Sequence, residues 1–389
     1  MLFTASTVKD SPAGLTEFVT RNLAGGVDHC LLFVDDADPA VLETFASHPH
    51  VTAVPTGPAW WHGKRPKQLN VRQRINANVA RALAAPLAGA DWIFHIDGDE
   101  ALVLDRGVVD ALPPEIEVVR AAPLEAVSRV KWPGRKVTHF KRMLEHEELT
   151  LLQVLGLIEE PLNGHYFHGH CEGKCGMRPT LRRWHALHDV HDHEQELVPA
   201  GDDGKGDWAR LLHYESWSGE EFVRKWMNIL ASGSKVSFRP VREPTAVALR
   251  ALLARDLPEK KLRAYLMRIF ERTTADDFET LLELGLLEQV DPLAGTHRPE
   301  PLGAERSRQL TALLAGVAPE NKWHFHTGRS AVEMLESLQA TASRVEQAGE
   351  AALVARAREV WTLPQAVLDD VTARQQPAGQ AGQAGQGSA

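Results

Sequence analysis

Hydrophobic residues near the start of the chain alternate between the spacing of strands and the spacing of helices. A short run of β-favouring residues predicts a strand at residues 2–8, and further strands are predicted at residues 30–34, where the run is continuously apolar, 51–54 and 92–96. Between them, apolar residues three or four positions apart predict helices over residues 15–23, 41–45 and 71–83. A regular succession of strand and helix is typical of α/β proteins, so we expect a mostly parallel, Rossmann-like sheet flanked by helices.

The pattern changes twice further along the chain. Residues 121–212 hold many loops, glycines and histidines without a sustained period, and we interpret them as the site-building half of the same domain. Beyond residue 240 helical spacing returns, including a helix around Phe278–Leu282 with Thr274 as its expected N-cap. We therefore expect an α/β domain, an α-helical C-terminal region and a disordered low-complexity tail, over residues 1–240, 241–372 and 373–389.

Composition and charge narrow the classes of protein that fit. The 389 residues carry 43 Lys and Arg against 52 Asp and Glu, a net charge of −9, which disfavours nucleic acid as a partner. Three cysteines, Cys30, Cys171 and Cys175, are too few for a disulfide scaffold and suit a reducing compartment. The sequence has no evident secretion signal and no apolar run of about 18 residues, so we expect a cytoplasmic protein without a transmembrane segment.

Two of the predicted strands end in acidic residues. The strand at 92–96 leads into Asp97-Gly98-Asp99, and the strand at 30–34 leads into Asp35-Asp36. Ligands of open α/β sheets bind beyond the carboxyl ends of the strands, so we expect these acids to line one cleft. Asp97 and Asp99 could approach a hard cation together, and Asp35 or Asp36 could accept hydrogen bonds from a ribose. The alternatives are a plain turn and a helix N-cap.

Basic and histidine residues further along could complete such a site. His213 precedes the capping-box sequence Ser218-Gly-Glu-Glu221, which predicts a loop position, and its imidazole is either a metal ligand or a structural group. Lys174 and Arg178 either hold a diphosphate or are solvated surface charges. A histidine-rich stretch also permits zinc, with candidate ligands His165, His168, His170, Cys171, Cys175, His185, His188, His191 and His193.

The motifs occur in an order that resembles a known family. They are Lys9-Asp10, Phe33-Val-Asp35-Asp36, Arg72-Gln73-Arg-Ile-Asn76, Trp92-Ile-Phe-His-Ile-Asp97-Gly-Asp99-Glu100, Gly173-Lys174, Arg178-Pro179 and His213-Tyr214-Glu-Ser-Trp-Ser218. Over residues 1–230 the chain resembles cytoplasmic glycosyltransferase family 2-like proteins, which use nucleotide sugars and have the GT-A fold. It departs from their usual Lys-Asn-Glu at Lys9-Asp10, and the C-terminal helices lie outside the resemblance.

The resemblance implies a function and roles for individual residues. The divalent cation, Mn²⁺ or Mg²⁺, would be bound by Asp97, Asp99 and His213 on the diphosphate of a nucleoside-diphosphate sugar donor. Nucleotide contacts are expected from Lys9, Asp35, Asp36, Gln73, Lys174 and Arg178. The resemblance favours inverting transfer of the sugar to a hydroxyl acceptor, which could be a glycan, a lipid or a small molecule. The catalytic base is expected at Asp189, with His188 as the alternative.

Other functions are compatible with the same residues. A sugar nucleotidyltransferase also uses a parallel sheet and a cation, but it would need a Gly-rich phosphate loop where this chain has Lys9-Asp10-Ser-Pro-Ala-Gly14. A non-catalytic nucleotide-sugar-binding protein would keep the fold, and a zinc hydrolase would use the histidine-rich stretch. The C-terminal helices are expected either to cover the acceptor side or to form a homo-oligomer.

Overall fold

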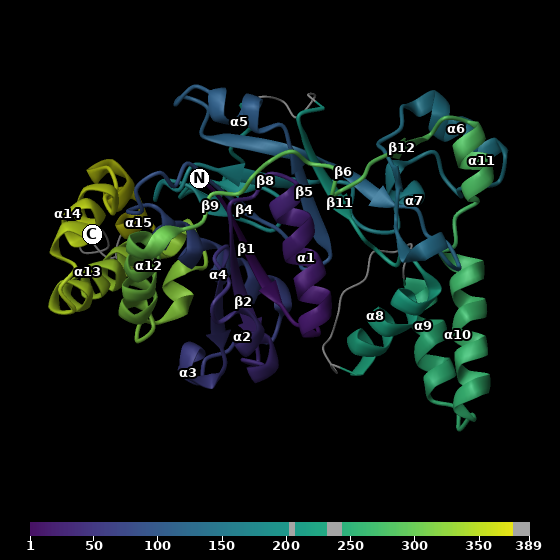
Figure 1. Cartoon of the computed structure of the whole chain (residues 1–389), viewed down its shortest axis with the longest axis horizontal. Coiled ribbons are helices and arrows are strands. Elements are labelled where there is room, and N and C mark those ends of the chain that lie inside the picture. Colours follow the sequence, from purple (N-terminus) through teal and green to yellow (C-terminus); the bar gives the residue numbers. More distant parts are fainter. Residues whose placement is uncertain (202–206, 232–242, 376–389) are drawn as a thin grey trace, which may run out of the picture.

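The computed structural model describes residues 1–201, 207–231 and 243–375 (Figure 1). Its first quarter alternates strands and helices, as β1 Leu2–Val8, α1 Pro12–Ala24, β2 His29–Asp35, α2 Pro39–Phe45, β3 Val51–Thr56, α3 Pro58–Trp61, α4 Leu69–Ala84 and β4 Trp92–His95. Every strand and helix predicted for this stretch is confirmed. The chain leaves α1 at Gly25, where a Cβ atom would lie 1.8 Å from the carbonyl oxygen of Leu102. Only glycine permits that close approach.

Strands β1 to β4 form a parallel block in the order β4-β1-β2-β3. Helical crossovers return the chain between successive strands, which is what parallel pairing requires. Alternate residues of β2 enter different cores. Leu31 and Phe33 belong to the core that contains Ile75 of α4, whereas Leu32 belongs to the core that contains Phe18 of α1. Helices therefore cover both faces of the block.

The sheet as a whole is mixed, so the expectation of a mostly parallel sheet is met only in this block. Its order is β12-β7-β6-β8-β4-β1-β2-β3, and β11 pairs with both β5 and β6. The pairs β4–β8, β6–β8, β6–β7, β7–β12 and β5–β11 are antiparallel. After β4 the chain reverses through turns and loops, which allow antiparallel pairing without a helical crossover.

Residues 100–213 supply the second half of this α/β unit. The elements here are β5 Glu100–Leu104, α5 Arg106–Ala111, β6 Val118–Ala126, β7 His139–Lys141, α6 His146–Val154, α7 Asn163–Tyr166, β8 Lys174–Met177, β9 Trp184–His185, β10 Val190–His191 and β11 Ala209–His213. Strand β6 connects the two parts of the sheet, because its first residues pair with β8 and its last residues pair with β11 and β7.

The remaining elements are mostly helical, as predicted. They are α8 Gly219–Ala231, α9 Glu243–Leu253, α10 Glu259–Thr273, α11 Phe278–Glu283, β12 Leu287–Gln289, α12 Gly303–Val317, α13 Ala331–Gln347, α14 Ala351–Val360 and α15 Gln365–Gln375. Short 3₁₀ helices lie at Pro133–Arg135, Lys322–Phe325 and Gly328–Ser330. Asp277, not Thr274, caps α11, and Thr274 instead ends α10.

The C-terminal helices form two groups at opposite ends of the molecule (Figure 1). Helices α12 to α15 extend the core around α4, since Leu310, Met334 and Leu338 share a cluster with Ile75. Helices α9 and α10 pack instead with α8, so the expected boundary at residue 240 divides one packed cluster.

The expected C-terminal tail and the expected lack of a transmembrane segment can be compared with the described residues only in part. Helix α15 reaches Gln375, and the rest of the expected tail lies outside the described residues. Within the described ranges, no helix combines the length and the hydropathy needed to cross a bilayer.

Candidate functional site

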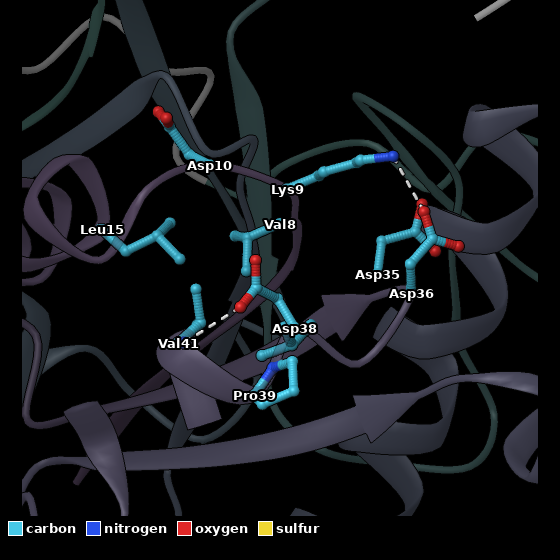
Figure 2. A pocket seen from close by; sticks show the side chains of 10 residues that line it. Val8, Lys9, Asp10, Leu15, Asp35, Asp36, Asp38, Pro39 and Val41 are labelled. Atoms are coloured by element: carbon cyan, nitrogen blue, oxygen red, sulfur yellow. Dashed lines mark hydrogen bonds and ion pairs between the residues drawn. The ribbon is translucent and has the colours of Figure 1, made fainter. Parts of the chain in front are cut away.

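A cavity of about 250 Å³ lies beyond the carboxyl ends of β1 and β2 (Figure 2). Its lining residues are Val8, Lys9, Asp10, Leu15, Val34, Asp35, Asp36, Asp38, Pro39 and Val41. Four of them are aspartates and one is a lysine, so the wall is rich in hydrogen-bond acceptors. The turn that follows β4 packs against one of these lining residues, because a Cβ atom on Gly98 would lie 3.5 Å from Val8 Cγ1.

Asp35, at the end of β2, is a buried carboxylate with two arginine partners. Arg65 Nη2 donates to both of its oxygens, at 2.9 and 3.0 Å, and Arg72 Nη2 donates at 3.0 Å. Only 4% of the Asp35 side chain is exposed. Charge-assisted bonds of this kind fix a carboxylate in place. Neither arginine was predicted as a site residue, although Arg72 lies in the quoted helix motif.

Asp36 and Lys9 face each other across the cavity rim (Figure 2). Lys9 Nζ lies 2.8 Å from Asp36 Oδ2, and this hydrogen bond is the main reason that the pKa of Asp36 lies below its usual value. The N-cap alternative falls to Asp38, which accepts from the backbone N–H of Ala40 at 2.9 Å at the start of α2. Lys9, Asp35 and Asp36 are therefore together, as expected.

Asp97 is held between two of the other predicted residues. Lys174 Nζ donates to Asp97 Oδ2 at 2.9 Å, and Gln73 Nε2 donates to Asp97 Oδ1. Burial alone would raise the pKa of Asp97, but the positive charge of Lys174, together with His95 and His170, lowers that pKa overall. Gln73 follows Arg72 directly in α4, so adjacent residues of one helix hold the acids at the ends of β2 and β4. The two strand ends meet at this helix.

Asp99, His213 and Glu215 form a group whose ligand atoms all lie within 4.8 Å of one another, as a metal site requires. His213 Nε2 lies 3.9 Å from Asp99 Oδ2 and 3.7 Å from Glu215 Oε2. Lys225 Nζ, from α8, donates to both carboxylates at 2.8 and 2.6 Å. His213 is the last residue of β11 rather than a loop residue as predicted. Asp97 belongs to no such group among the described residues.

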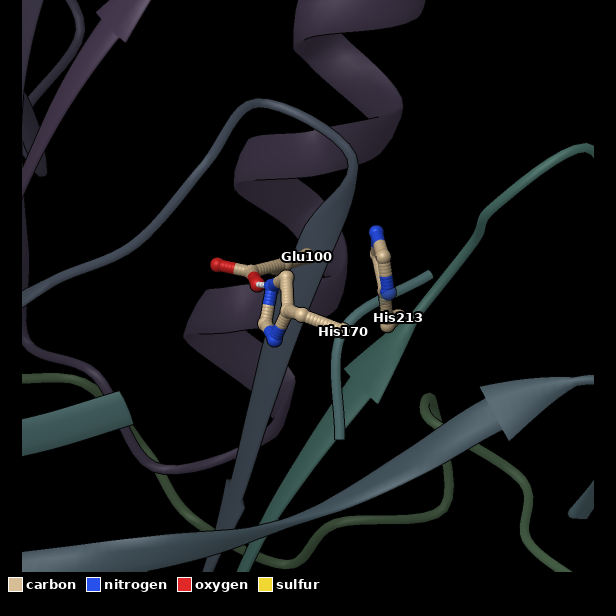
Figure 3. A group of neighbouring side chains, drawn as sticks. All are labelled: Glu100, His170 and His213. Carbon is tan, nitrogen blue, oxygen red and sulfur yellow. Dashed lines mark hydrogen bonds and ion pairs between the residues drawn. The ribbon is translucent and has the colours of Figure 1, made fainter. Parts of the chain in front are cut away.

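A second group of potential ligands consists of Glu100, His170 and His213 (Figure 3). His170 Nε2 lies 2.9 Å from Glu100 Oε1, and the His170 ring stacks on His213 with centroids 4.8 Å apart. Glu100 was quoted only as the end of a motif, and His170 only as a zinc candidate. Because Glu100 directly follows Asp99, its position was readable from the sequence, whereas the return of His170 from a distant loop was not.

Of the two expected bases, His188 lies at this site and Asp189 faces away toward Arg120. Burial, helped by Lys174, lowers the pKa of His188 to about 4, and its ring lies 4.1 Å from that of His170. His188 Nδ1 lies 3.1 Å from the carbonyl oxygen of Gly173. The carboxylate of Asp189 accepts a charge-assisted hydrogen bond from Arg120.

Arg178 does not join Lys174, in contrast to the expected basic pair. Its guanidinium donates to the carbonyl oxygens of Leu112 and Ile116 and lies over the Trp92 ring. Lys174 begins β8 and Arg178 follows its end, and four residues of a strand span about 13 Å. Lys174 therefore reaches the carboxyl end of β4, while Arg178 reaches the opposite end.

The zinc candidates of the histidine-rich stretch are spread over the structure. Among the described residues, His170 joins the group with Glu100 and His213, and His193 forms a surface group with Glu194 and Asp370. Cys171 and Cys175 belong to no metal-competent group in the described part of the chain. A zinc site built from this stretch alone is therefore not assembled.

Comparison with known proteins leaves the family open. No protein-family model matches the chain. A search of the curated proteins likewise gives no match. A function for this chain is therefore supported only by the geometry of the site and by the sequence motifs.

Proposed function

We propose that this protein is a metal-dependent, inverting glycosyltransferase of the GT-A type, which moves a sugar from a nucleoside-diphosphate donor to a hydroxyl acceptor. The observation that carries the proposal is the position of the metal-competent group of Asp99, His213 and Glu215. Its member Asp99 lies in the turn after β4, and that turn packs against Val8, which lines an acceptor-rich cavity at the carboxyl ends of β1 and β2. Open α/β sheets bind nucleotides at that edge.

The cavity suits the nucleoside part of the donor. Asp10 and Asp36 offer carboxylate oxygens to ribose hydroxyls or base N–H groups, and Asp35 is fixed by Arg65 and Arg72. A diphosphate that leaves the cavity toward the turn at Gly98 reaches Asp99, Lys225 and His213. The negative phosphates then face a lysine that already bridges Asp99 and Glu215.

Catalysis by this arrangement is electrostatic. A divalent cation held there would neutralise charge that develops on the departing diphosphate. Lys225 places a positive charge next to the carboxylates of Asp99 and Glu215. Lys174 holds Asp97 in position through its ion pair. His188 is the better placed of the two expected bases. Its Nδ1 is engaged by the Gly173 carbonyl, so Nε2, which lies 3.6 Å from Glu172 Oε2, would have to be the proton acceptor.

The experiment is a thermal-shift screen of nucleoside diphosphates with and without Mn²⁺. A ligand that binds only the native state raises the melting temperature by mass action. We expect stabilisation by a diphosphate only when Mn²⁺ is present, and its loss in Asp99→Ala. The matched control is Asp110→Asn, which changes an exposed carboxylate on α5.

Three results would decide against the proposal. Equal stabilisation without metal would remove the cation from donor binding, and equal stabilisation of Asp99→Ala would remove Asp99 from the site. Metal-dependent binding without any release of diphosphate from nucleotide sugars would indicate a binding protein instead of a transferase.

A further inference from the structure

We infer that His170 and Glu100 complete the ion site with His213, that Glu125 orients it, and that the site therefore selects a transition metal ion over Mg²⁺. This inference deepens the proposed function by naming ligands that the motif pattern does not include. Glu100, His170 and His213 come from β5, the loop after α7, and β11 (Figure 3). Their ligand atoms all lie within 4.8 Å of one another.

The chemistry of the donor set favours nitrogen-binding metals. Two imidazoles and one carboxylate are a recurrent ligand set for Zn²⁺, which leaves a further position open. Mg²⁺ instead prefers oxygen ligands and gives up its water reluctantly. Affinity of such sites rises from Mn²⁺ through Co²⁺ toward the later metals, with Zn²⁺ also tight. A site of this composition therefore binds Co²⁺ and Zn²⁺ more tightly than Mg²⁺.

The loop that carries His170 is pressed against His213. A Cβ atom at Gly169 would lie 2.3 Å from His213 Cε1 and 2.7 Å from Glu125 Oε2. Any residue other than glycine at position 169 would displace His213 or Glu125. The stacked rings of His170 and His213 follow from this close approach.

Glu125 is a buried carboxylate that holds the loop of His170 and lies next to His213. It is completely buried, lies 2.9 Å from Lys141 Nζ, and accepts hydrogen bonds from the backbone N–H groups of His168 and Gly169. These bonds fix the loop on which His170 is carried. On its other side, Glu125 Oε2 lies 3.9 Å from His213 Nδ1.

The Nδ1 atoms of His170 and His213 also support an ion site. His213 Nδ1 and His170 Nδ1 are buried and have no hydrogen-bond partner among the described residues. Such unsatisfied groups are rare and call for an explanation. A metal-bound histidine almost always donates its other N–H to a carboxylate. Glu125 Oε2 lies 3.9 Å from His213 Nδ1, too far for a hydrogen bond as the side chains stand, and we assign it as the carboxylate that receives this N–H when an ion is bound. Glu125 is thus a positioning residue that aims His213 at the ion.

The test is metal binding by the full-length protein after chelator treatment, with Co²⁺ as the probe. Cobalt absorption in the visible range strengthens when the ion exchanges its six waters for fewer protein ligands, and the measurement needs no enzymatic activity. We expect Co²⁺ to bind, Zn²⁺ to displace it, and excess Mg²⁺ to leave the spectrum unchanged. Glu125→Gln should weaken Co²⁺ binding by about 10- to 100-fold, the usual effect of losing an orienting partner. His170→Gln should weaken it at least as much, because it removes a ligand.

His165→Gln is the matched control, since His165 lies on the same stretch but in none of the candidate groups of described residues. Unchanged Co²⁺ affinity in His170→Gln, or an equal loss in His165→Gln, would overturn the inference. Should Glu125→Gln fail to fold, His170→Gln still decides, because its side chain is partly exposed. Displacement of Co²⁺ by Mg²⁺ would also contradict it.

Failure of this inference is distinguishable from failure of the proposed function. Cobalt binding that depends on His170, without stabilisation by any nucleoside diphosphate, would keep the metal site and remove the transferase. Diphosphate binding that is equally strong with Mg²⁺ and indifferent to His170→Gln would keep the transferase and remove this metal site.

Discussion

Replacing Lys141 by methionine tests the buried network beneath the candidate site. Lys141 is completely buried in β7, where its ammonium lies 2.9 Å from Glu125 and 3.2 Å from Asp276 and donates to the Tyr166 carbonyl at 2.8 Å. Methionine keeps the length of the side chain but removes the charge and the donors. Two carboxylates then remain buried without their cation.

The expected loss follows from that burial. Breaking a buried ion pair by removing one partner costs about 3–5 kcal/mol, because the remaining charge is uncompensated. Lys136→Met is the matched control, since Lys136 also pairs with one aspartate, Asp291, but both side chains are about half exposed. Exposed pairs contribute about 0–1 kcal/mol. We therefore expect Lys141→Met to lower the free energy of unfolding several times more than Lys136→Met.

Urea unfolding at a series of pH values measures the effect and its sign. Burial alone would raise the pKa of Asp276, but Lys141 and His168 outweigh it and lower that pKa to about 2. In the wild type, this contribution to stability is full above the unfolded pKa near 4 and is lost as pH falls toward 2. Without Lys141 the carboxylates protonate more easily, so the gap between variant and wild type should narrow as pH falls from 7 toward 4. Equal losses for both lysines, or a gap that widens in acid, would refute the reasoning.

Three further changes have expected outcomes. Asp28→Asn should cost about 1–3 kcal/mol in urea unfolding, since Asp28 is buried and accepts from Arg106 Nη1 at 2.8 Å; an unchanged midpoint would contradict this role. Gly169→Ala should cost about 1–3 kcal/mol, because its Cβ would collide with His213, and should weaken Co²⁺ binding in the same preparation. Leu338 lies in the fully buried face of α13, so Leu338→Ala should lower the free energy of unfolding by about 2–5 kcal/mol in thermal unfolding. A loss under 1 kcal/mol would show that α13 does not contribute to the main core.

The parallel block was predictable because its strands and helices keep clear periods. β1 and β2 are buried along their whole length, and Cys30 to Val34 in β2 is a continuous apolar run. The later strands lack that signal, since β5 begins with Glu100, β7 ends with Lys141 and β8 begins with Lys174. Each of these charges is buried with a partner from far along the chain, which for Lys141 is Asp276. Such pairing is invisible to local periodicity, which is why the mixed sheet was missed.

The candidate site divides in the same way. Acids at strand ends could be predicted, because the topology alone places Asp35, Asp97 and Asp99 at one edge. Their partners could not, because Arg65 and His170 reach the site from loops whose return depends on the whole fold. The predicted pairing of Arg178 with Lys174 was wrong for a simpler reason. Residues only four positions apart along a strand can reach opposite ends of the neighbouring strand.

The most direct measurement of the central claim is anomalous diffraction from a crystal soaked with Mn²⁺ and a nucleoside diphosphate. The account predicts a manganese peak within coordination distance of His213 Nε2 and a carboxylate oxygen of Asp99, with the diphosphate on the same ion. It also predicts the nucleoside in the cavity between Asp10 and Asp36. A nucleotide bound elsewhere, or manganese found only at the His193 surface group, would contradict it.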